Sequence, residues 1–170
     1  LPKSAGRVGL WYFLSHNGNI DAEATVAKLD DTHLWYCSAA AAEYHDMDWL
    51  TERLPAGSDV QIASLTNSHT VLIIAGPQAR TLMDAACPRT SFAQDDFPWM
   101  TAKPCLVGYV EAIVMAVSFS GEQAFEVHVP NIQLHAAYLT LTDAGKAYGL
   151  AHFGMYAIDS MRKTIRLASI

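Results

Sequence analysis

Short apolar runs separated by turn-forming clusters are the feature that most limits how this chain can fold. The best candidate for a membrane span, residues 112–119, is only as long as a strand and too short to cross a bilayer. The cluster His16-Asn17-Gly18-Asn19 lies between two strand-like runs and predicts a β-hairpin. Helical periodicity also occurs in several segments, so the pattern predicts an α+β fold.

The order of the expected elements follows from the same pattern. Four alanines begin a helix after the third strand, and Pro55-Ala56-Gly57 ends it. No segment has the composition of a linker, so we expect residues 1–170 to form one domain with a substantial core. Strands are expected at 8–14, 23–29, 34–38, 60–65, 71–75, 106–109, 111–119 and 125–129, and helices at 39–54, 77–86, 130–145 and 154–163.

Composition excludes several classes of protein. Hydrophobic residues make up 51% of the chain and charged residues only 16%, which argues against disorder. So few charges also suggest that part of the surface is covered by another domain or subunit, and a homo-oligomer is one form this could take. The net charge of −6 argues against binding to nucleic acid or to an anionic membrane, because both require a positively charged surface.

The cysteines and the absence of familiar motifs narrow the chemistry further. Three cysteines, an odd number at wide spacing and without a CxxC, argue against a disulfide framework and predict a reducing compartment. This compartment would be the cytoplasm or, in a eukaryote, the mitochondrial matrix. No HExxH spacing points to a metal site, and no GxGxxG or Walker loop signals a flavin or nucleotide domain.

Asp46 is the first candidate functional residue. On a helix over residues 39–54 it falls within an apolar stripe that includes Trp49, whereas Asp48 falls on the polar side. Burial of a carboxylate is costly, and it would raise the pKa so that Asp46 could accept a proton near neutral pH. The alternatives are a carboxylate at the edge of the surface or one in a salt bridge, for example with Arg53.

Glu126 and Arg162 are the other two candidates from pattern alone. In the strand expected at 125–129, Glu126 and His128 share one face, which is either a binding face or simply a solvated one. A carboxylate can accept two parallel hydrogen bonds from the edge of an amino-heterocycle. Arg162, on the last expected helix, could bind a ligand carboxylate or instead pair with Asp159.

Six segments, taken in order, resemble the aminomethyltransferase family, to which the glycine cleavage T-protein belongs. The helix containing "HDMDW" is similar to a Lys/His-Asp-x-x-Trp motif, and "FPWM" to a Phe-Pro-x-Met loop. Both forms look most like the folate domain of dimethylglycine and sarcosine dehydrogenases. The segments are residues 6–26, 36–50, 73–83 (with Gly-Pro-x-Ala-Arg), 97–102, 118–130 (with Ser-Phe-Ser-Gly-Glu) and 153–162.

The resemblance implies a function and assigns roles to individual residues. It implies a central folate-binding domain that contains a ferredoxin-like part, with a mixed or antiparallel sheet and packed helices. The family's N-terminal stretch and C-terminal barrel would lie outside these residues. By resemblance, Asp46 is the catalytic aspartate near the folate nitrogens, Glu126 binds the pterin ring, and Arg162 lies on the folate side of the pocket. Tetrahydrofolate would accept an aminomethyl or iminium carbon to form 5,10-methylene-tetrahydrofolate, and a flavin oxidoreductase domain or subunit would be the partner.

The sequence also departs from the family pattern. By resemblance Phe119 is also a folate-binding residue, but it stands where the family usually has tyrosine and so lacks a hydroxyl near the ligand. Ala124 stands where the family usually has glycine. After Arg162 the chain reads Lys163-Thr164-Ile165-Arg166 in place of Leu-Glu-x-Gly. Two hypotheses therefore stand side by side: an active one-carbon transferase module, and a relative that kept the fold as a binding or structural subunit. The sequence names neither the amine donor nor the oligomeric state.

Overall fold

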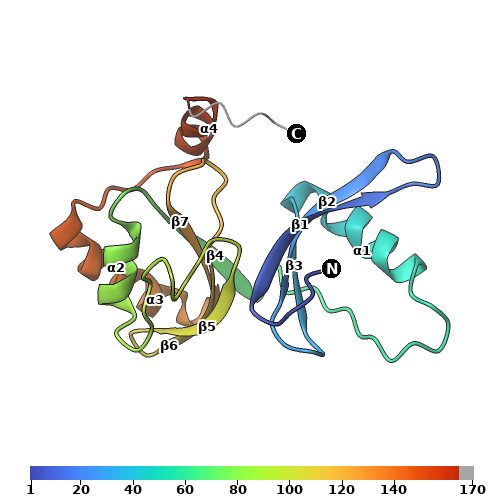
Figure 1. Ribbon diagram of the computed structural model, residues 1–170, viewed down its shortest axis with the longest axis horizontal. Coiled ribbons are helices and arrows are strands. Elements are labelled where there is room, and N and C mark those ends of the chain that lie inside the picture. Colours follow the sequence, from blue (N-terminus) through green and yellow to red (C-terminus); the bar gives the residue numbers. More distant parts are fainter. Residues whose placement is uncertain (165–170) are drawn as a thin grey trace. The chain divides into compact units, whose positions relative to one another are not determined.

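The computed structural model describes residues 1–164, which form two compact units (Figure 1). The first unit runs from Leu1 to Asn67, and the second begins at Ser68. Each has its own sheet, and every strand pairing within the described residues is antiparallel. The expected α+β class is confirmed, and the sheets are of the antiparallel kind. Both units lie within the span that the sequence predicts as one domain.

The N-terminal unit is built on a three-stranded sheet in the order β1-β2-β3. Its strands are β1 (Arg7–Leu14), β2 (Ile20–Lys28) and β3 (Leu34–Cys37). The predicted hairpin joins β1 to β2: Ser15 donates a backbone hydrogen bond to Asn19, and Gly18 takes a φ of 79° that favours glycine. Small residues along β2, such as Ala22 and Ala24, are buried.

The helix of this unit lies across one face of the sheet. A 3₁₀ turn, η1 (Ala40–Ala42), leads into α1 (Glu43–Glu52), and Trp49 packs edge-on against Phe13 with ring centroids 5.0 Å apart. The helix is shorter than predicted. The strand expected at 60–65 is wrong: residues 58–65 adopt no regular structure, and Val60 is exposed, so these residues form no ladder.

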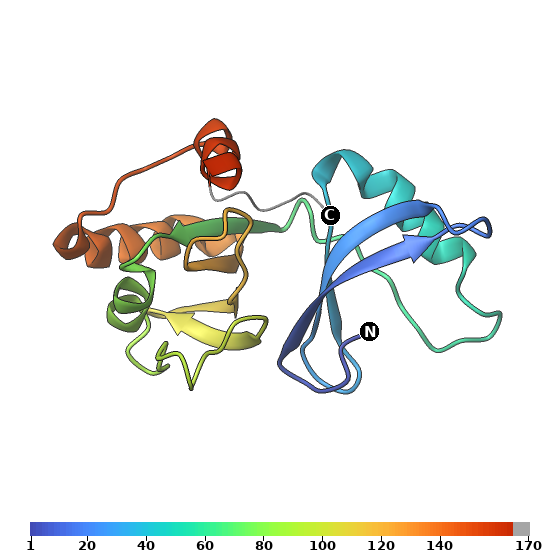
Figure 2. The same cartoon turned by 45° about the horizontal axis from the view of Figure 1, so that its top comes forward.

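The C-terminal unit has a four-stranded sheet in the order β4-β7-β6-β5. Two helices, α2 (Ala79–Ala86) and α3 (Leu134–Gly145), pack side by side against one face of it (Figure 2). The core between them is apolar and includes Phe92, Phe97 and Phe125, all fully buried. The strands are β4 (His69–Ala75), β5 (Ala102–Val107), β6 (Val110–Met115) and β7 (Ala124–Pro130).

The opposite face of this sheet carries the third helix of the unit, α4 (Met155–Thr164), near the ends of β4 and β7. Because side chains alternate along a strand, Phe125 lies in the core beneath α2 and α3, and Glu126 lies on the other face. There Glu126 is the ladder partner of Ile73. Ile158 and Met161 of α4 face the same region. The residues beyond 164, which include Ile165 and Arg166 of the altered stretch after Arg162, lie outside the described part.

The ferredoxin-like part of the fold prediction does not hold for the described strands. A ferredoxin-like unit has the order βαββαβ. Here β5, β6 and β7 follow one another as hairpin-connected neighbours, and β7 pairs with β4. The eight residues between β6 and β7 (116–123) contain no helix, so the second helix of the βαββαβ order is missing from this connection.

Candidate functional site

Asp46 lies in the first turn of α1 and is buried, with 3% of its surface exposed. The Tyr36 hydroxyl donates a hydrogen bond to Oδ2 over 3.1 Å, and His45 Nδ1 lies 3.0 Å from Oδ1. Of the alternatives, the position at the surface edge is wrong because Asp46 is buried, and the suggested partner Arg53 lies instead over the Trp49 ring at 4.0 Å. His45 is in ion-pair range of Asp46 when its ring is protonated. Partners from β3 and α1 therefore hold the carboxylate in one orientation.

The electrostatics of Asp46 differ from the expectation. Burial raises the pKa of this carboxyl, but hydrogen bonds from Ser38, His45 and Tyr36 outweigh burial, and the pKa lies below its ordinary value. The raised pKa predicted from burial alone is therefore wrong in direction. Burial and the hydrogen bond to Asp46 raise the pKa of Tyr36 to about 12. Asp46 is thus ionised at neutral pH, and its Tyr36 neighbour keeps its proton.

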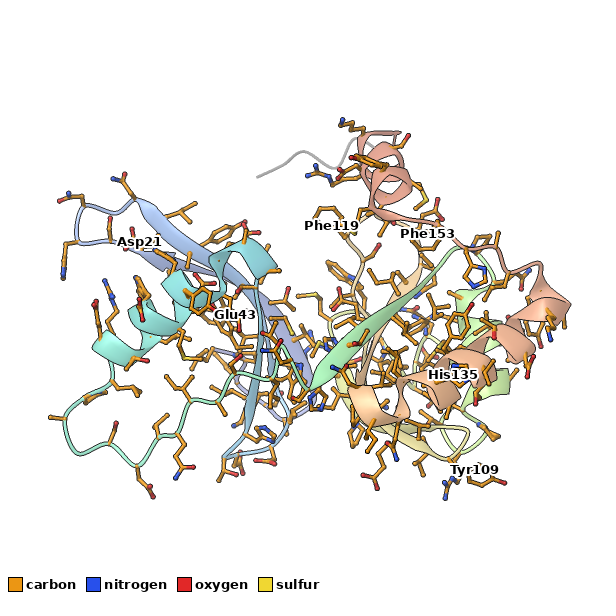
Figure 3. All side chains as sticks on the ribbon, turned by 180° about the vertical axis from the view of Figure 1, so that it is seen from behind. Asp21, Glu43, Tyr109, Phe119, His135 and Phe153 are labelled. Carbon is orange, nitrogen blue, oxygen red and sulfur yellow. The ribbon has the colours of Figure 1, made fainter. Side chains whose placement is uncertain are left out.

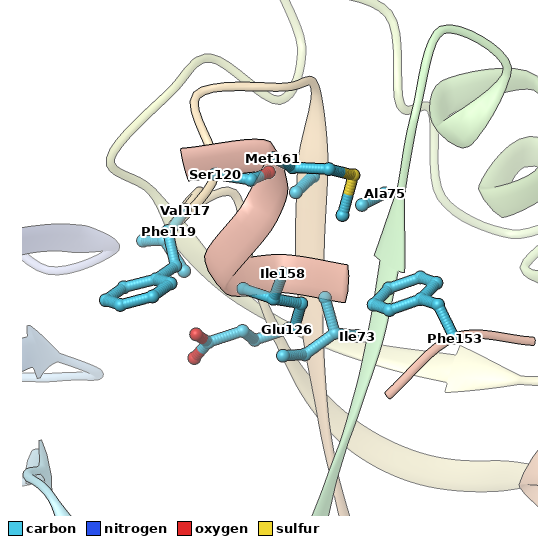
Figure 4. Close-up of a pocket in the computed structure, with 10 residues that line it drawn as sticks. Ile73, Ala75, Val117, Phe119, Ser120, Glu126, Phe153, Ile158 and Met161 are labelled. Atoms are coloured by element: carbon cyan, nitrogen blue, oxygen red, sulfur yellow. The ribbon is translucent and has the colours of Figure 1, made fainter. Parts of the chain in front are cut away.

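A hollow in the C-terminal unit surrounds Glu126 with apolar side chains (Figure 4). The hollow is small and opens to solvent, so most of the space beside Glu126 is continuous with the surrounding solvent. Glu126 is its charged lining residue, and 26% of that side chain is exposed. Its lining comes from β4, β7, α4 and the segments beside them: Ile73, Ala75, Val117, Phe119, Ser120, Ala124, Glu126, Phe153, Ile158 and Met161.

His128 accompanies Glu126 on the same face of β7. Its Nε2 lies 3.3 Å from Glu126 Oε2, and only 4% of the residue is exposed. The interpretation of this face as a solvated one is therefore wrong, because His128 is buried and Glu126 is partly so. A carboxylate in these surroundings is costly unless it finds hydrogen-bond donors.

Arg162 and Phe119 meet at the edge of the same hollow. The Arg162 guanidinium lies over the Phe119 ring at 4.9 Å, and its Nη2 is 3.7 Å from Asp159 Oδ1. The expected alternative, an ion pair with Asp159, is thus present alongside the ring contact. Phe119 is 53% exposed at the mouth of the hollow, and Figure 3 shows it on the same side of the unit as Phe153.

Two polar atoms near Arg162 and Phe119 are left with unused bonding capacity. Within the described residues, Arg162 Nε and Ser118 Oγ are buried and have no hydrogen-bond partner. Buried polar groups normally find partners, so such atoms often mark a place where a ligand or water completes the network. Sequence reasoning did not single out Ser118, although it begins the family-like segment 118–130.

The structure brings three of the four predicted site residues to one place. Glu126, Phe119 and Arg162 all belong to the C-terminal unit and lie at its hollow, whereas Asp46 belongs to the N-terminal unit. The hollow also uses Ile158 and Met161, which the sequence analysis missed as lining residues. Their spacing of three residues on a helix is a signal that could have identified them.

The sequence of this chain is similar to those of known proteins. The sequence profile of the GCVT N-terminal domain matches residues 1–168. The chain belongs to this family. It is 28% identical over 163 residues to human dimethylglycine dehydrogenase, mitochondrial, covering 95% of this chain and 19% of that protein. It is also 28% identical over 152 residues to the mouse pyruvate dehydrogenase phosphatase regulatory subunit, mitochondrial, covering 88% of this chain and 17% of that protein.

Fold comparison agrees with the sequence match. The crystal structure of glycine cleavage system aminomethyltransferase T from Bartonella henselae superposes with a TM-score of 0.76 at 21% identity. The match covers 94% of this chain and 40% of that one. The chain spans about a fifth of the length of the dimethylglycine dehydrogenases that it matches.

Other features of the described residues carry little chemistry. No helix in residues 1–164 combines the length and hydrophobicity that a membrane crossing requires. The same residues contain no group of three His, Cys, Asp or Glu side chains placed to hold a metal ion. Cys87 and Cys105 are free and buried, and burial raises the pKa of the Cys87 thiol to about 12, which makes it a poor nucleophile.

Proposed function

We propose that this chain is a tetrahydrofolate-binding module that handles a one-carbon unit, as the family resemblance implies. The observation that carries the proposal is the Glu126 carboxylate in an otherwise largely apolar hollow, at whose edge Arg162 stacks on Phe119 and has a buried Nε donor with no partner among the described residues. A pterin ring is flat and largely apolar on its faces, with hydrogen-bond donors along one edge. The hollow offers complementary groups: apolar walls, one acceptor carboxylate and an aromatic ring at the mouth.

Glu126 would recognise the amino-heterocycle edge. A carboxylate has about four lone-pair positions, and the contact with His128 at Oε2 leaves most of them for a ligand. Two parallel N–H donors on one ring edge match the two carboxylate oxygens, and such charge-assisted pairs are among the stronger hydrogen bonds. The energetic cost of holding Glu126 among apolar neighbours is offset when the ligand supplies those donors.

Phe119 and Arg162 would contact the ligand at the mouth of the hollow. The Phe119 ring keeps the aromatic surface of the family's tyrosine and lacks only its hydroxyl, and Arg162 stacks on that ring. Arg162 Nε remains a buried donor without a partner in the described part of the chain, so it is suited to an acceptor oxygen on the ligand. Ser118 Oγ, also without a partner there, is a second group that the ligand could satisfy.

By resemblance to the family's aspartate, Asp46 would act as an electrostatic stabiliser in the transfer of the one-carbon unit. Its lowered pKa means that it carries a negative charge at neutral pH, and three hydrogen bonds fix its direction. A fixed anion stabilises a cationic iminium and the positive charge that develops on nitrogen as a carbon is transferred. Tetrahydrofolate, when bound, supplies the nitrogens that accept the carbon. This role suits Asp46 better than that of a neutral-pH proton acceptor.

Calorimetric titration of the 170-residue chain with tetrahydrofolate under anaerobic conditions tests the proposal. We expect binding by the wild type and a loss of about tenfold to a hundredfold in affinity for Glu126→Gln. Glu111→Gln is the matched control, because Glu111 lies on β6 of the same sheet and is exposed. Absence of any binding by the wild type would refute the proposal, and equal losses in the two variants would refute the role of Glu126.

A second candidate is a binding or structural module that no longer catalyses transfer. Similarity to a protein named as a regulatory subunit favours it, as does the loss of the tyrosine hydroxyl at Phe119. Ala124 argues neither way: it begins β7 opposite Ala75 with an ordinary strand φ, so a glycine is not needed there. Supplying an iminium chemically and measuring 5,10-methylene-tetrahydrofolate distinguishes the two, since this candidate binds folate but yields no product above background.

The family resemblance and the composition also imply partners for this chain. A flavin oxidoreductase domain or subunit would generate the iminium by oxidising an amine. Self-association is a further proposal from the low charged fraction of 16%. Light scattering coupled to size exclusion tests it, and a monomer at all concentrations would reject it.

A further inference from the structure

The loop that carries Phe119 and Ser120 into the hollow is anchored at both ends. This anchored loop comprises residues 116–123, between β6 and β7. At its start, Ala116 donates to Thr101 O and accepts from Met100 N, both at 2.8 Å. At its end, Gln123 O accepts a hydrogen bond from Gly76 N at 2.9 Å. Met100, Thr101 and Gly76, which hold the loop, lie in two family-like segments (97–102 and 73–83), and none of these three residues lines the hollow.

The first anchor contains a strained residue. Met100 has a φ of 59°, and it is the one non-glycine residue with positive φ among residues 1–164. Such a conformation is unfavourable for a side chain with a Cβ, and it persists where surrounding contacts enforce it. Here the backbone bonds to Ala116, together with the Thr101 hydroxyl bonded to Pro98 O, enforce it. Strain of this kind is concentrated at functional sites.

Arg80 links the two anchors through its side chain. Its Nε donates to Gln123 Oε1 at 3.0 Å, and its Nη1 donates to Phe92 O and to Phe97 O, the latter at 3.0 Å. Its Nη2 donates to Gln94 Oε1, and the guanidinium lies 5.4 Å from the centre of the Phe125 ring. The planar fork thus ties α2 to the segment before Met100 and to the end of the anchored loop.

We propose that Arg80 and Gln123 are positioning residues that hold the anchored loop so that Phe119 and Ser120 face Glu126 across the hollow. Neither side chain lines the hollow, so their influence on a ligand passes through the loop. The inference rests on the proposed function, because it takes a ligand in this hollow as given. Preorganisation of the loop lowers the entropy that binding would otherwise lose.

Two glutamines on the same guanidinium allow a matched test. Gln123 and Gln94 each accept one hydrogen bond from Arg80, but only Gln123 belongs to the anchored loop. Gln123→Met and Gln94→Met each remove one such bond while keeping side-chain length. Titration with tetrahydrofolate is the binding measurement, with thermal melting as the check on folding. Gln123→Glu restores an acceptor for Arg80 and serves as the rescue variant.

We expect Gln123→Met to weaken tetrahydrofolate binding about fivefold to tenfold, and Gln94→Met to leave it within about twofold. Gln123→Glu is expected to bind within about twofold of wild type. Equal affinity in Gln123→Met and wild type, or equal losses in both methionine variants, would overturn the inference while leaving the proposed function intact if Glu126→Gln still loses binding. If Gln123→Met does not fold, Gln123→Asn, whose shorter amide withdraws from Arg80, takes its place with the same expected outcomes.

Discussion

Each unit shields one carboxylate from solvent, Asp46 fully and Glu126 partly, but the two are surrounded in different ways. In the N-terminal unit, Asp46 is surrounded by donors from its own chain, with Tyr36 and His45 within 3.1 Å. In the C-terminal unit, Glu126 sits in a largely apolar hollow, and Arg162 Nε nearby has no partner in the described residues. One carboxylate is already satisfied, whereas the surroundings of the other are incomplete.

This difference suggests a division of labour. A carboxylate whose bonds are complete has a fixed direction and a fixed charge, which suits stabilisation of a charged reacting group. A carboxylate with unused acceptor capacity beside an unused donor suits recognition of a polar ligand edge. We infer that affinity depends mainly on the C-terminal unit and that Asp46 affects the chemical step more than binding.

The largest expected effect concerns stability and compares the aromatic residues of the two units. Phe97 is fully buried and stacks on Phe92 at 4.9 Å, so Phe97→Ala should cost about 3–5 kcal/mol of the free energy of unfolding. Phe13 in the N-terminal unit is only half-buried, and Phe13→Ala should cost about 1–2 kcal/mol. Urea denaturation followed by circular dichroism gives both values. Equal costs would show that the packing of the two units is alike.

The next effect separates chemistry from binding. We expect Asp46→Asn to reduce formation of 5,10-methylene-tetrahydrofolate about a hundredfold or more while its folate affinity changes less than about threefold. Asp48→Asn, on the same helix but exposed, is the control and should change neither quantity. A large loss of affinity in Asp46→Asn would contradict the proposed division.

A smaller effect is the response of the N-terminal unit to acid. Because the pKa of Asp46 is lowered on folding, its contribution to stability is present above the ordinary aspartate pKa of about 3.9 and is lost as pH falls through the lower folded value. Tyr36→Phe removes one of the bonds that lower this pKa, so it should reduce stability at pH 7 by about 1–2 kcal/mol and have less effect at pH 2. Urea titrations at the two pH values test this. An equal loss at both would mean that the bond does not depend on the charge of Asp46.

The smallest expected effect concerns the departure from the family at the hollow. Phe119→Tyr adds the hydroxyl that the family usually has, at a position where the ring is already 53% exposed. We expect folate affinity to rise by no more than about fivefold, with thermal stability unchanged. Calorimetric titration beside Tyr109→Phe, which alters a fully exposed ring elsewhere in the unit, provides the comparison. A decrease in affinity would indicate that the family's hydroxyl has no place in this hollow.

Sequence patterns predicted the local structure well where neighbours in the chain determine it. The turn around Gly18 follows from backbone geometry. So does the strand alternation that places Glu126 and Phe125 on opposite faces of the sheet. The strand expected at 60–65 failed because strands need a partner, and periodicity does not reveal whether one is available. The direction of the Asp46 pKa was missed because its donors include Tyr36, ten residues away on another element.

By itself, the sequence determined the α+β class, the order of most elements, the family and three residues that meet at one hollow. These depend on local periodicity and on the order of motifs, both of which are present in the amino-acid sequence itself. Only the tertiary structure decided that the chain forms two units, that Asp46 is ionised, and that Arg80 joins two motifs to the loop carrying Phe119. Hydrogen bonds and burial arise between residues far apart in the chain, so their energies depend on distances that no local pattern contains.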